Sequence, residues 1–145
     1  MTVFVDTSVL VAAVLEQHPD HEAALSVVTR IQDGKDNGLI SGHSLAEVYS
    51  TLTRMPAPFR HSPEQALLTI EENFLKFFKV ASLSGSDYAS LIREAAATGI
   101  QGGTIYDAVH LKSAAKEKAQ KIYTLNLKHF QAIAPVELTR ILMTP

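Results

Sequence analysis

The chain has 145 residues, of which 46% are hydrophobic and 19% charged, as expected for a globular protein of one domain. It contains no cysteine, which excludes disulfide bonds, thiolate metal sites and cysteine nucleophiles. Thirteen Lys and Arg against fifteen Asp and Glu give a formal net charge of −2, so the composition does not point to the usual basic type of nucleic-acid-binding domain.

The chain shows no signal for a membrane or for secretion. No apolar run approaches the ~18 residues that a membrane-spanning helix needs, and the first residues lack the pattern of a signal peptide. We therefore expect a cytoplasmic protein without a membrane partner.

Short apolar runs alternate with longer amphipathic runs along the chain. The predicted strands are residues 2–5, 39–41, 77–83 and 121–125, with a last extended piece near VELT at 136–139. The predicted helices are residues 7–15, 19–31, 44–55, 62–77, 86–98 and 103–119, with a short helical turn in 126–133. This alternation favours a mostly parallel sheet of four to five strands with helices on both faces. We predict one three-layer α/β/α domain over residues 1–145.

Three acids, Asp6, Glu47 and Asp107, stand in corresponding places. Asp6 directly follows the first strand. Glu47 lies in the first turn of the helix after the second strand if Ser44 is the N-cap, and Asp107 lies in the first turn of the helix before the fourth strand, with Thr104 as N-cap. Each acid therefore has an ordinary interpretation as a cap or as a partner of the helix dipole.

The same placement also predicts a shared site. In an α/β sheet the carboxyl ends of the strands meet at one edge, so we expect Asp6, Glu47 and Asp107 to converge there. Converging carboxylates repel one another unless a cation lies between them, and Mg²⁺ typically takes one or two carboxylates together with waters and substrate phosphate. The expected cofactor is therefore Mg²⁺ or Mn²⁺.

Other chemistry finds little support in the sequence. The histidines lack the HExxH spacing of zinc enzymes, and no G-x-S-x-G nucleophile motif is present. A phosphotransferase with a D-x-D nucleophile is disfavoured because Ser8 stands two residues after Asp6. We expect His43 to be solvated, and His110 to serve packing or a hydrogen bond behind the site rather than to act as a general base.

Four segments resemble, in the right order, the successive motifs of PIN-domain ribonucleases, and among these the VapC-like toxins of toxin–antitoxin pairs. They are FVDTSVLVAAV, SLAEVYSTL, GGTIYDAVHLKSAA and IYTLNLKHF. The resemblance covers nearly the whole chain and implies a metal-dependent endoribonuclease. It implies that Asp6 and Asp107 bind the metal, with Glu47 as the second acid of the motif set. Ser8 and Thr104 match hydroxyl residues that line the same pocket.

Two positions depart from the family pattern. Asn126 stands in the T-x-N/D motif after the fourth strand, where many relatives carry a fourth acid, and His129 replaces a further acid that often precedes the motif's Phe. The site is therefore expected to hold one metal ion firmly and a second only with help from substrate phosphate.

The resemblance also implies partners, namely an RNA substrate, a cognate antitoxin and a second copy of the chain in a homodimer. The antitoxin surface is expected around residues 55–63 and the flanking helices, although Leu52, Met55, Leu67 and Leu68 there also suit a helix core. The expected RNA contacts are Lys112, Lys116, Lys128, Arg54 and Arg60. Two alternatives remain at this stage: a PIN-like binding or scaffold domain with a defective site, and a PIN nuclease of RNA processing.

Overall fold

The computed structural model describes residues 1–145, which form five strands, eight α-helices and one π-helical segment. The strands are β1 (Thr2–Val5), β2 (Asn37–Ser41), β3 (Phe78–Ala81), β4 (Lys121–Tyr123) and β5 (Leu142–Met143). The α-helices are α1 (Thr7–Val14), α2 (His21–Gln32), α3 (Gly42–Arg54), α4 (Pro63–Ile70), α5 (Gly85–Thr98), α6 (Thr104–Lys116), α7 (Leu127–Ile133) and α8 (Val136–Thr139), and the π-helical segment η1 is Glu71–Leu75.

The five strands form one sheet in the order β3-β2-β1-β4-β5, and every neighbouring pair is parallel. The predicted parallel α/β/α architecture is thereby confirmed. The strand order reverses at β1, because the chain builds outward first through β2 and β3 and then through β4 and β5. Ligands of such sheets bind outside the carboxyl ends of the strands at this reversal, which here lies between β1 and β4.

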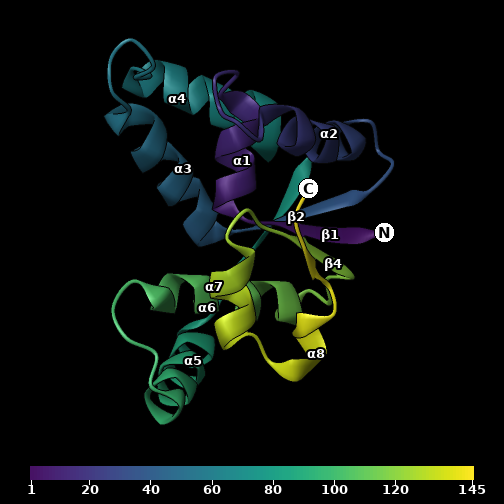
Figure 1. The fold of residues 1–145 in the computed structure, drawn as a ribbon, viewed down its shortest axis with the longest axis vertical. Helices are drawn as coiled ribbons and strands as arrows, with labels where there is room; N and C mark the ends of the chain where they lie inside the picture. Colours follow the sequence, from purple (N-terminus) through teal and green to yellow (C-terminus); the bar gives the residue numbers. More distant parts are fainter.

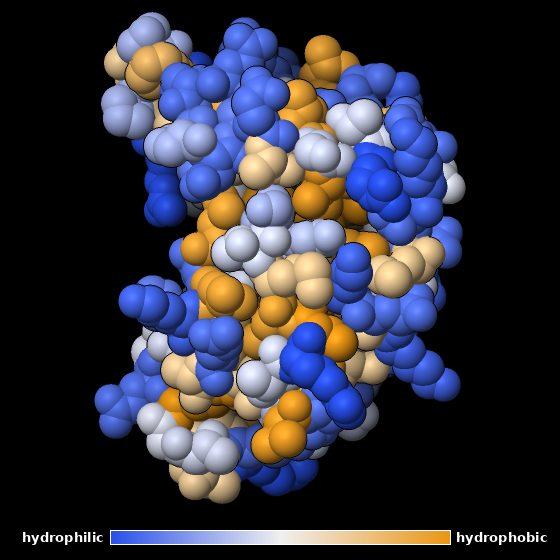
Figure 2. Space-filling view, turned by 45° about the vertical axis from the view of Figure 1, so that its right-hand side comes forward, coloured by the Kyte–Doolittle hydropathy of each residue, from blue (hydrophilic) through white to orange (hydrophobic).

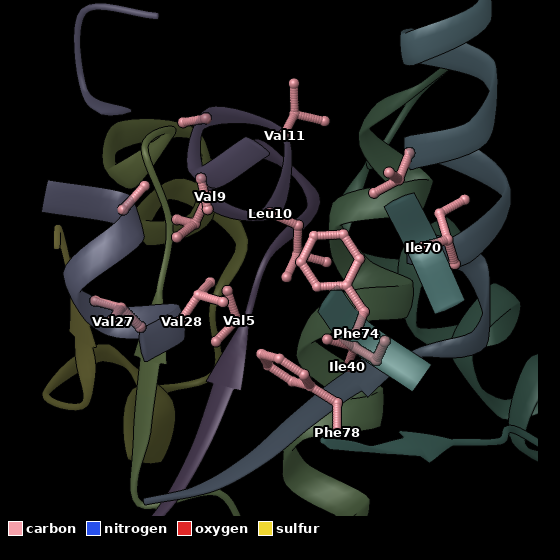
Figure 3. Close-up of a cluster of buried hydrophobic side chains, with 14 of the residues drawn as sticks. Val5, Val9, Leu10, Val11, Val27, Val28, Ile40, Ile70, Phe74 and Phe78 are labelled. Atoms are coloured by element: carbon pink, nitrogen blue, oxygen red, sulfur yellow. The ribbon is translucent and has the colours of Figure 1, made fainter. Parts of the chain in front are cut away.

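Helices α1 to α4 cover one face of the sheet and α5 to α8 lie on the other (Figure 1). Alternate residues of a strand point to opposite faces, so Val3 and Val5 of β1 enter the larger core cluster and Phe4 enters the smaller one. In the larger cluster the rings of Phe74 and Phe78 meet edge to face beside Leu10 of α1 (Figure 3).

The outer surfaces of both helical layers are mostly polar, and apolar surface shows mainly between them (Figure 2). In the same view the outline of the molecule is hollowed on the left, between the α1–α4 layer above and the α5–α8 layer below. None of the helices combines the length and the hydropathy that a membrane span requires.

Several element boundaries differ from the sequence prediction. Helix α3 begins at Gly42 with Ser41 as its N-cap, so Ser44 is not the cap and Glu47 lies beyond the first turn. Gly103, not Thr104, is the N-cap of α6, whereas Asp107 does lie in its first turn. The VELT segment is helix α8, and the last strand follows it at residues 142–143.

The predicted helix over 62–77 is present, with the capping box between Ser62 and Gln65 that its sequence indicates, but its second half is π-helical. The exposed apolar residues of this region include Phe59, Leu67 and Leu68, whereas Leu52 is fully buried in the core. The core interpretation therefore holds for Leu52 and is wrong for Leu67 and Leu68.

Candidate active site

Asp6 directly follows β1 at the point where the strand order reverses, and only 3% of the residue is exposed. Its Oδ2 accepts hydrogen bonds from Ser8 Oγ at 2.7 Å and from Thr124 Oγ1 at 2.9 Å. The two hydroxyl oxygens in turn accept backbone N–H groups, Ser8 from Leu125 and Thr124 from Asn126, both at 3.0 Å. Both hydroxyl protons are therefore directed at Asp6, which fixes the carboxylate across the β1–β4 junction.

The side chain of Asp6 does not cap helix α1, although Asp6 occupies the N-cap position. Its Oδ1 has no hydrogen-bond donor, and the nearest ionisable side chain is His110, with Nε2 at 3.8 Å. One oxygen of this buried carboxylate therefore remains available to a ligand.

Glu47 of α3 faces the same edge of the sheet. Its Oε1 accepts hydrogen bonds from His110 Nε2 at 2.7 Å and from Thr7 Oγ1 at 3.2 Å, and His43 Nε2 lies 3.5 Å away. Burial raises the pKa of Glu47, but the hydrogen bond and charge of His110, helped by His43 and Thr7, outweigh it and hold the pKa below its usual value. Glu47 is therefore an anion at neutral pH.

His110 of α6 joins Glu47 to strand β2. The residue is only 1% exposed, and its Nδ1 lies 2.8 Å from Ser41 Oγ. Ser41 Oγ also accepts the Ser44 N–H at the start of α3, so the ring is held between Ser41 at Nδ1 and Glu47 at Nε2. This buried position agrees with the expectation that His110 serves packing or a hydrogen bond behind the acids. The hydrogen bond goes directly to Glu47 and holds its carboxylate in place.

His43 is not simply solvated, contrary to the sequence prediction. Besides lying near Glu47, its ring stacks on that of Tyr106, with centroids 4.7 Å apart and planes at 13°. The stacked rings therefore join α3 to α6 beside Glu47.

Asp107 completes the group from the first turn of α6. It is half-buried, and its carboxylate accepts no hydrogen bond from another side chain or from the backbone. Burial raises its pKa, as do the charges of Asp6 and Glu47, while His110 and His129 act in the opposite direction. The structure therefore brings the three predicted acids together closely enough for their charges to interact.

The other residues predicted for the site have different surroundings. Thr104 is half-buried in the first turn of α6, and its hydroxyl makes no hydrogen bond within the chain. Asn126 is exposed at the N-cap position of α7 and makes no capping bond with its side chain. His129 is exposed and close enough to Asp107 to lower the pKa of that acid.

The basic residues predicted to contact RNA are mostly engaged within the chain. Lys112 pairs with Glu94 at 3.7 Å and Lys116 with Asp87 at 2.6 Å, and Arg60 Nε donates to the carbonyl of Met55. Lys128 and Arg54 are exposed and form no ion pair. RNA contact remains a prediction for all five, and the structure favours Lys128 and Arg54.

A sizeable cavity of the molecule lies away from the acids. It measures about 610 Å³ and is lined by α5, α6 and the α7–α8 segment, with Lys112 and Glu137 at its wall. None of Asp6, Glu47 and Asp107 lines it. This cavity is therefore separate from the acids of the sheet edge.

The chain matches a model of a known protein family over most of its length. The model of the PIN domain matches residues 3–134. The chain belongs to the PIN-domain family. The match runs from β1 through α7, so it includes all three acids of the sheet edge.

Relatives of this PIN domain cover most of its length. Ribonuclease VapC27 of Mycobacterium tuberculosis is 33% identical over 116 residues, which are 80% of this chain and 79% of the relative. Ribonuclease VapC40 of the same species is 32% identical over 124 residues, 85% of both chains.

Solved structures share the fold of this PIN domain. VapBC2 from Rickettsia felis, bound to a DNA fragment from its promoter, superposes with a TM-score of 0.67 at 23% identity and covers 100% of this chain and 99% of its own. VapC20 of Mycobacterium tuberculosis, a toxin that cleaves the sarcin–ricin loop, gives a TM-score of 0.69 at 18% identity, covering 92% and 96%. These likenesses extend the family assignment to the three-dimensional fold.

The donor set of this PIN domain fits a hard cation with an incomplete protein shell. No three His, Asp or Glu side chains stand together as a ready-made metal cluster. Asp6 Oδ1, Glu47 Oε2 and both oxygens of Asp107 nevertheless lack hydrogen-bond donors, and no Lys or Arg pairs with these acids. Mg²⁺ commonly binds one or two carboxylates and keeps several waters. These free oxygens therefore suit Mg²⁺ although the protein supplies only part of the coordination shell.

Sequence reasoning missed two hydroxyl residues of the PIN-domain site, Thr7 and Thr124, which donate to Glu47 and Asp6. Thr124 had a signal, because it belongs to the same T-x-N motif from which Asn126 was selected. Thr7 had none, because a Thr at the start of a helix is ordinary in any sequence.

Proposed function

We propose that this PIN domain is a ribonuclease that hydrolyses RNA phosphodiesters with Mg²⁺ or Mn²⁺, and that it is the toxin of a toxin–antitoxin pair. One observation carries the proposal: three carboxylates with free oxygens lie at the point of strand reversal, close enough for their charges to interact, in a chain 33% identical to a ribonuclease. Such a set of oxygens suits a divalent cation and a phosphodiester substrate.

Asp6 and Asp107 would hold the ion, with Glu47 assisting. A bound Mg²⁺ or Mn²⁺ supplies Lewis acidity and lowers the pKa of a coordinated water, which makes hydrolysis possible without a protein nucleophile. Ser8 and Thr124 keep Asp6 in one orientation through Oδ2, so that Oδ1 is presented without rearrangement. His110 does the same for Glu47 through Oε1. The hydrogen bonds to these carboxylates therefore preorganise the acids before any ligand binds.

The direct test is RNA cleavage by purified protein with Mg²⁺, with cleavage sites mapped on total RNA. The variants Asp6→Asn and Asp107→Asn should each abolish cutting, while Asp33→Asn, the same change in the turn after α2, should cut like the parent chain. Cutting retained by either site variant would contradict the assignment of these acids.

A scaffold domain with a defective site is the second candidate, because Asn126 and His129 replace acids expected from the family pattern. Calorimetric titration with Mn²⁺ separates the two functions. A nuclease should bind Mn²⁺ in a way that Asp6→Asn and Asp107→Asn weaken and Asp33→Asn does not. Binding that is absent, or equal in all variants, would favour the scaffold.

The proposed antitoxin and the second copy of the chain would bind the apolar surface near α4, which we define as Phe59, Leu67 and Leu68. These side chains are 46%, 53% and 58% exposed, which is unusual for three large apolar residues in one region. The description of the neighbouring VapC20 calls it a toxin, and the neighbours VapBC2 and FitAB were solved bound to DNA fragments, which supports the antitoxin part of this proposal.

Co-expression tests the antitoxin. Expression of the chain alone should arrest growth, and the product of an adjacent gene should restore growth and co-purify with the chain. The double variant Leu67→Ser/Leu68→Ser should weaken co-purification and leave RNA cutting intact. Harmless expression, or the lack of any such neighbouring product, would contradict the toxin role while leaving the ribonuclease assay as a separate result. Light scattering of the purified chain reports whether it is a dimer.

A further inference from the structure

Tyr106 is an exposed aromatic residue beside the acidic site, and it directly precedes Asp107 in helix α6. The residue is 49% exposed, in contrast to its half-buried neighbour Asp107. His43 covers one face of its ring, and no second aromatic side chain stacks on the other. Tyr106 therefore remains largely open to solvent beside His43.

This exposed ring has a rigid support. His43 stacks on it from the site side, with ring centroids 4.7 Å apart, and His43 is followed inward by His110 at 5.8 Å. His110 lies parallel to Phe130 at 6.5 Å and tilted against Phe4 at 6.1 Å, both fully buried. Tyr106 is thus the outer end of a column of rings that begins in the core.

The charge distribution of the chain suggests that RNA binding needs a contribution other than phosphate contacts. The net charge is −2, and three of the five basic residues predicted for RNA contact are engaged within the chain. Phosphate contacts alone therefore supply little affinity for RNA at an edge that already carries three acids. Stacking of a base on an aromatic ring does not depend on charge and contributes to single-strand binding.

We propose that Tyr106, backed by His43, is a stacking site for the base of a nucleotide that adjoins the scissile phosphate. The inference rests on the proposed ribonuclease function and identifies a place where the RNA substrate binds. His43 lies 3.5 Å from Glu47 and stacks on Tyr106, so a base on this ring lies beside the acidic site, separated from Glu47 by the ring of His43. The subsite accepts any base, because every base has a π-face.

The test is a cycle of protein and substrate changes. Tyr106→Ala should raise KM for a mapped single-stranded RNA by roughly 5- to 150-fold, the range typical of one stacked base, with a smaller change in kcat. Tyr106→Phe should keep the parental KM because it keeps the ring. On RNA that is abasic on the stacked side of the cleavage site, the parent chain and Tyr106→Ala should have equal KM values.

Two controls separate stacking from other effects. Tyr49→Ala removes a tyrosine of 41% exposure from α3, two residues past Glu47 and hence on another side of that helix, and should leave KM unchanged. Raising the salt concentration should preserve the ratio between Tyr106→Ala and the parent chain, whereas the effect of Lys128→Ala should shrink. Circular dichroism of Tyr106→Ala should match the parent, because the side chain is exposed.

The outcomes distinguish the two proposals. If Tyr106→Ala cuts with parental KM, or retains its defect on RNA abasic on either side of the cleavage site, the stacking site is wrong and the ribonuclease stands. If parental KM is accompanied by loss of co-purification with the neighbouring gene product, Tyr106 serves the antitoxin instead. If the parent chain cuts no RNA, the proposed function fails. Stacking is then decided by quenching of 2-aminopurine in single-stranded RNA bound to the Asp6→Asn protein, which Tyr106→Ala must abolish.

Discussion

His110 Nε2 lies 2.7 Å from Glu47 Oε1, and the opposite nitrogen of the same ring lies 2.8 Å from Ser41 Oγ. The ring therefore connects helix α6 to the N-cap of α3 and sets the position of Glu47 from behind. Because His110 is buried and its partner is charged, His110→Ala should lower the free energy of unfolding by about 2–4 kcal/mol.

Two amide replacements separate the two ends of the ring. Gln places an amide near the position of Nε2 and keeps a donor for Glu47, whereas Asn keeps a polar group only near Ser41. His110→Asn should reduce RNA cleavage by about 10- to 100-fold, the usual loss when a residue that orients a metal ligand is removed, and His110→Gln by less. Equal activities of the two variants at equal stability would show that the bond to Glu47 is not what matters.

The fold was predictable because its signals are local and repeated. Apolar runs such as residues 2–5 alternate with helical segments, and a parallel sheet with helices on both faces follows from that order alone. The prediction failed where two local signals compete. Ser41 and Ser44 are both suitable caps, and only the structure shows that the helix begins at Gly42. At VELT, the β-branched residues suggested an extended segment, but the chain forms a short helix after Pro135.

The places of Asp6 after a strand and of Asp107 at a helix start were predictable, and Glu47 was predicted on the right helix although not at the right turn. The residues that support these acids were not predictable. Thr7 and Glu47 are 40 residues apart, and His110 and Glu47 are 63 apart, so no spacing in the sequence reveals these bonds. The stacking of His43 on Tyr106 is equally non-local, since it depends on how α3 packs on α6. Such contacts become visible only when the helices are placed.

Asp107 should destabilise the protein when no metal is present. Burial and the charges of Asp6 and Glu47 disfavour its ionised form, so Asp107→Asn should unfold at a higher temperature than the parent chain in EDTA at neutral pH. With Mn²⁺ at about 100 times its dissociation constant, the parent should gain about 2.7 kcal/mol and the variant much less. Thermal melts with and without Mn²⁺ measure both effects, and a less stable Asp107→Asn protein in EDTA would contradict the predicted repulsion.

Asp87 should contribute to acid unfolding. Its hydrogen bond from Lys116, helped by the Ser84 backbone, lowers its pKa from 3.8 to about 2 in the folded chain. A lowered folded pKa means that the stabilisation is complete above pH 3.8 and disappears as the pH falls toward 2. The stability difference between the parent and Asp87→Asn should therefore be largest at neutral pH and shrink over this interval.

Urea unfolding at a series of pH values measures this difference. Lys116→Met should remove much of the same pH dependence, because it removes the main partner of Asp87. A difference between parent and Asp87→Asn that stays constant from neutral pH down to pH 2 would contradict the assignment.

Gly38 of β2 should tolerate no side chain. A Cβ there would lie 2.5 Å from Ile31 Cγ2 and 2.7 Å from Phe78 Cδ1, both in the larger core cluster. Gly38→Ala should therefore cost about 1–3 kcal/mol, as overpacking of a core usually does. Gly85→Ala is the matched control, because nothing lies within 4 Å of its Cβ and the residue starts helix α5, so this change should be neutral or slightly stabilising. Denaturant unfolding compares the two, and equal midpoints would disprove the close contact at Gly38.

Asn126 should decide how many metal ions the site holds. Its backbone N–H binds Thr124 Oγ1 at 3.0 Å, and Thr124 donates to Asp6, so residue 126 stands two hydrogen bonds from the central acid. Its side chain is exposed and makes no capping bond, and an acid at the start of α7 gains about 0.3–1 kcal/mol from the helix dipole. Asn126→Asp should therefore fold well and add a fourth carboxylate.

The expected result is a second Mn²⁺ per chain in calorimetric titration, together with faster RNA cleavage at low Mg²⁺, because hard cations bind more tightly as carboxylates are added. Asn37→Asp is the matched control. It adds the same charge at an exposed Asn, but at the start of β2 and thus at the opposite edge of the parallel sheet. If both variants bind Mn²⁺ like the parent chain, residue 126 does not reach the metal. If both bind more, the gain comes from net charge and not from a ligand at position 126.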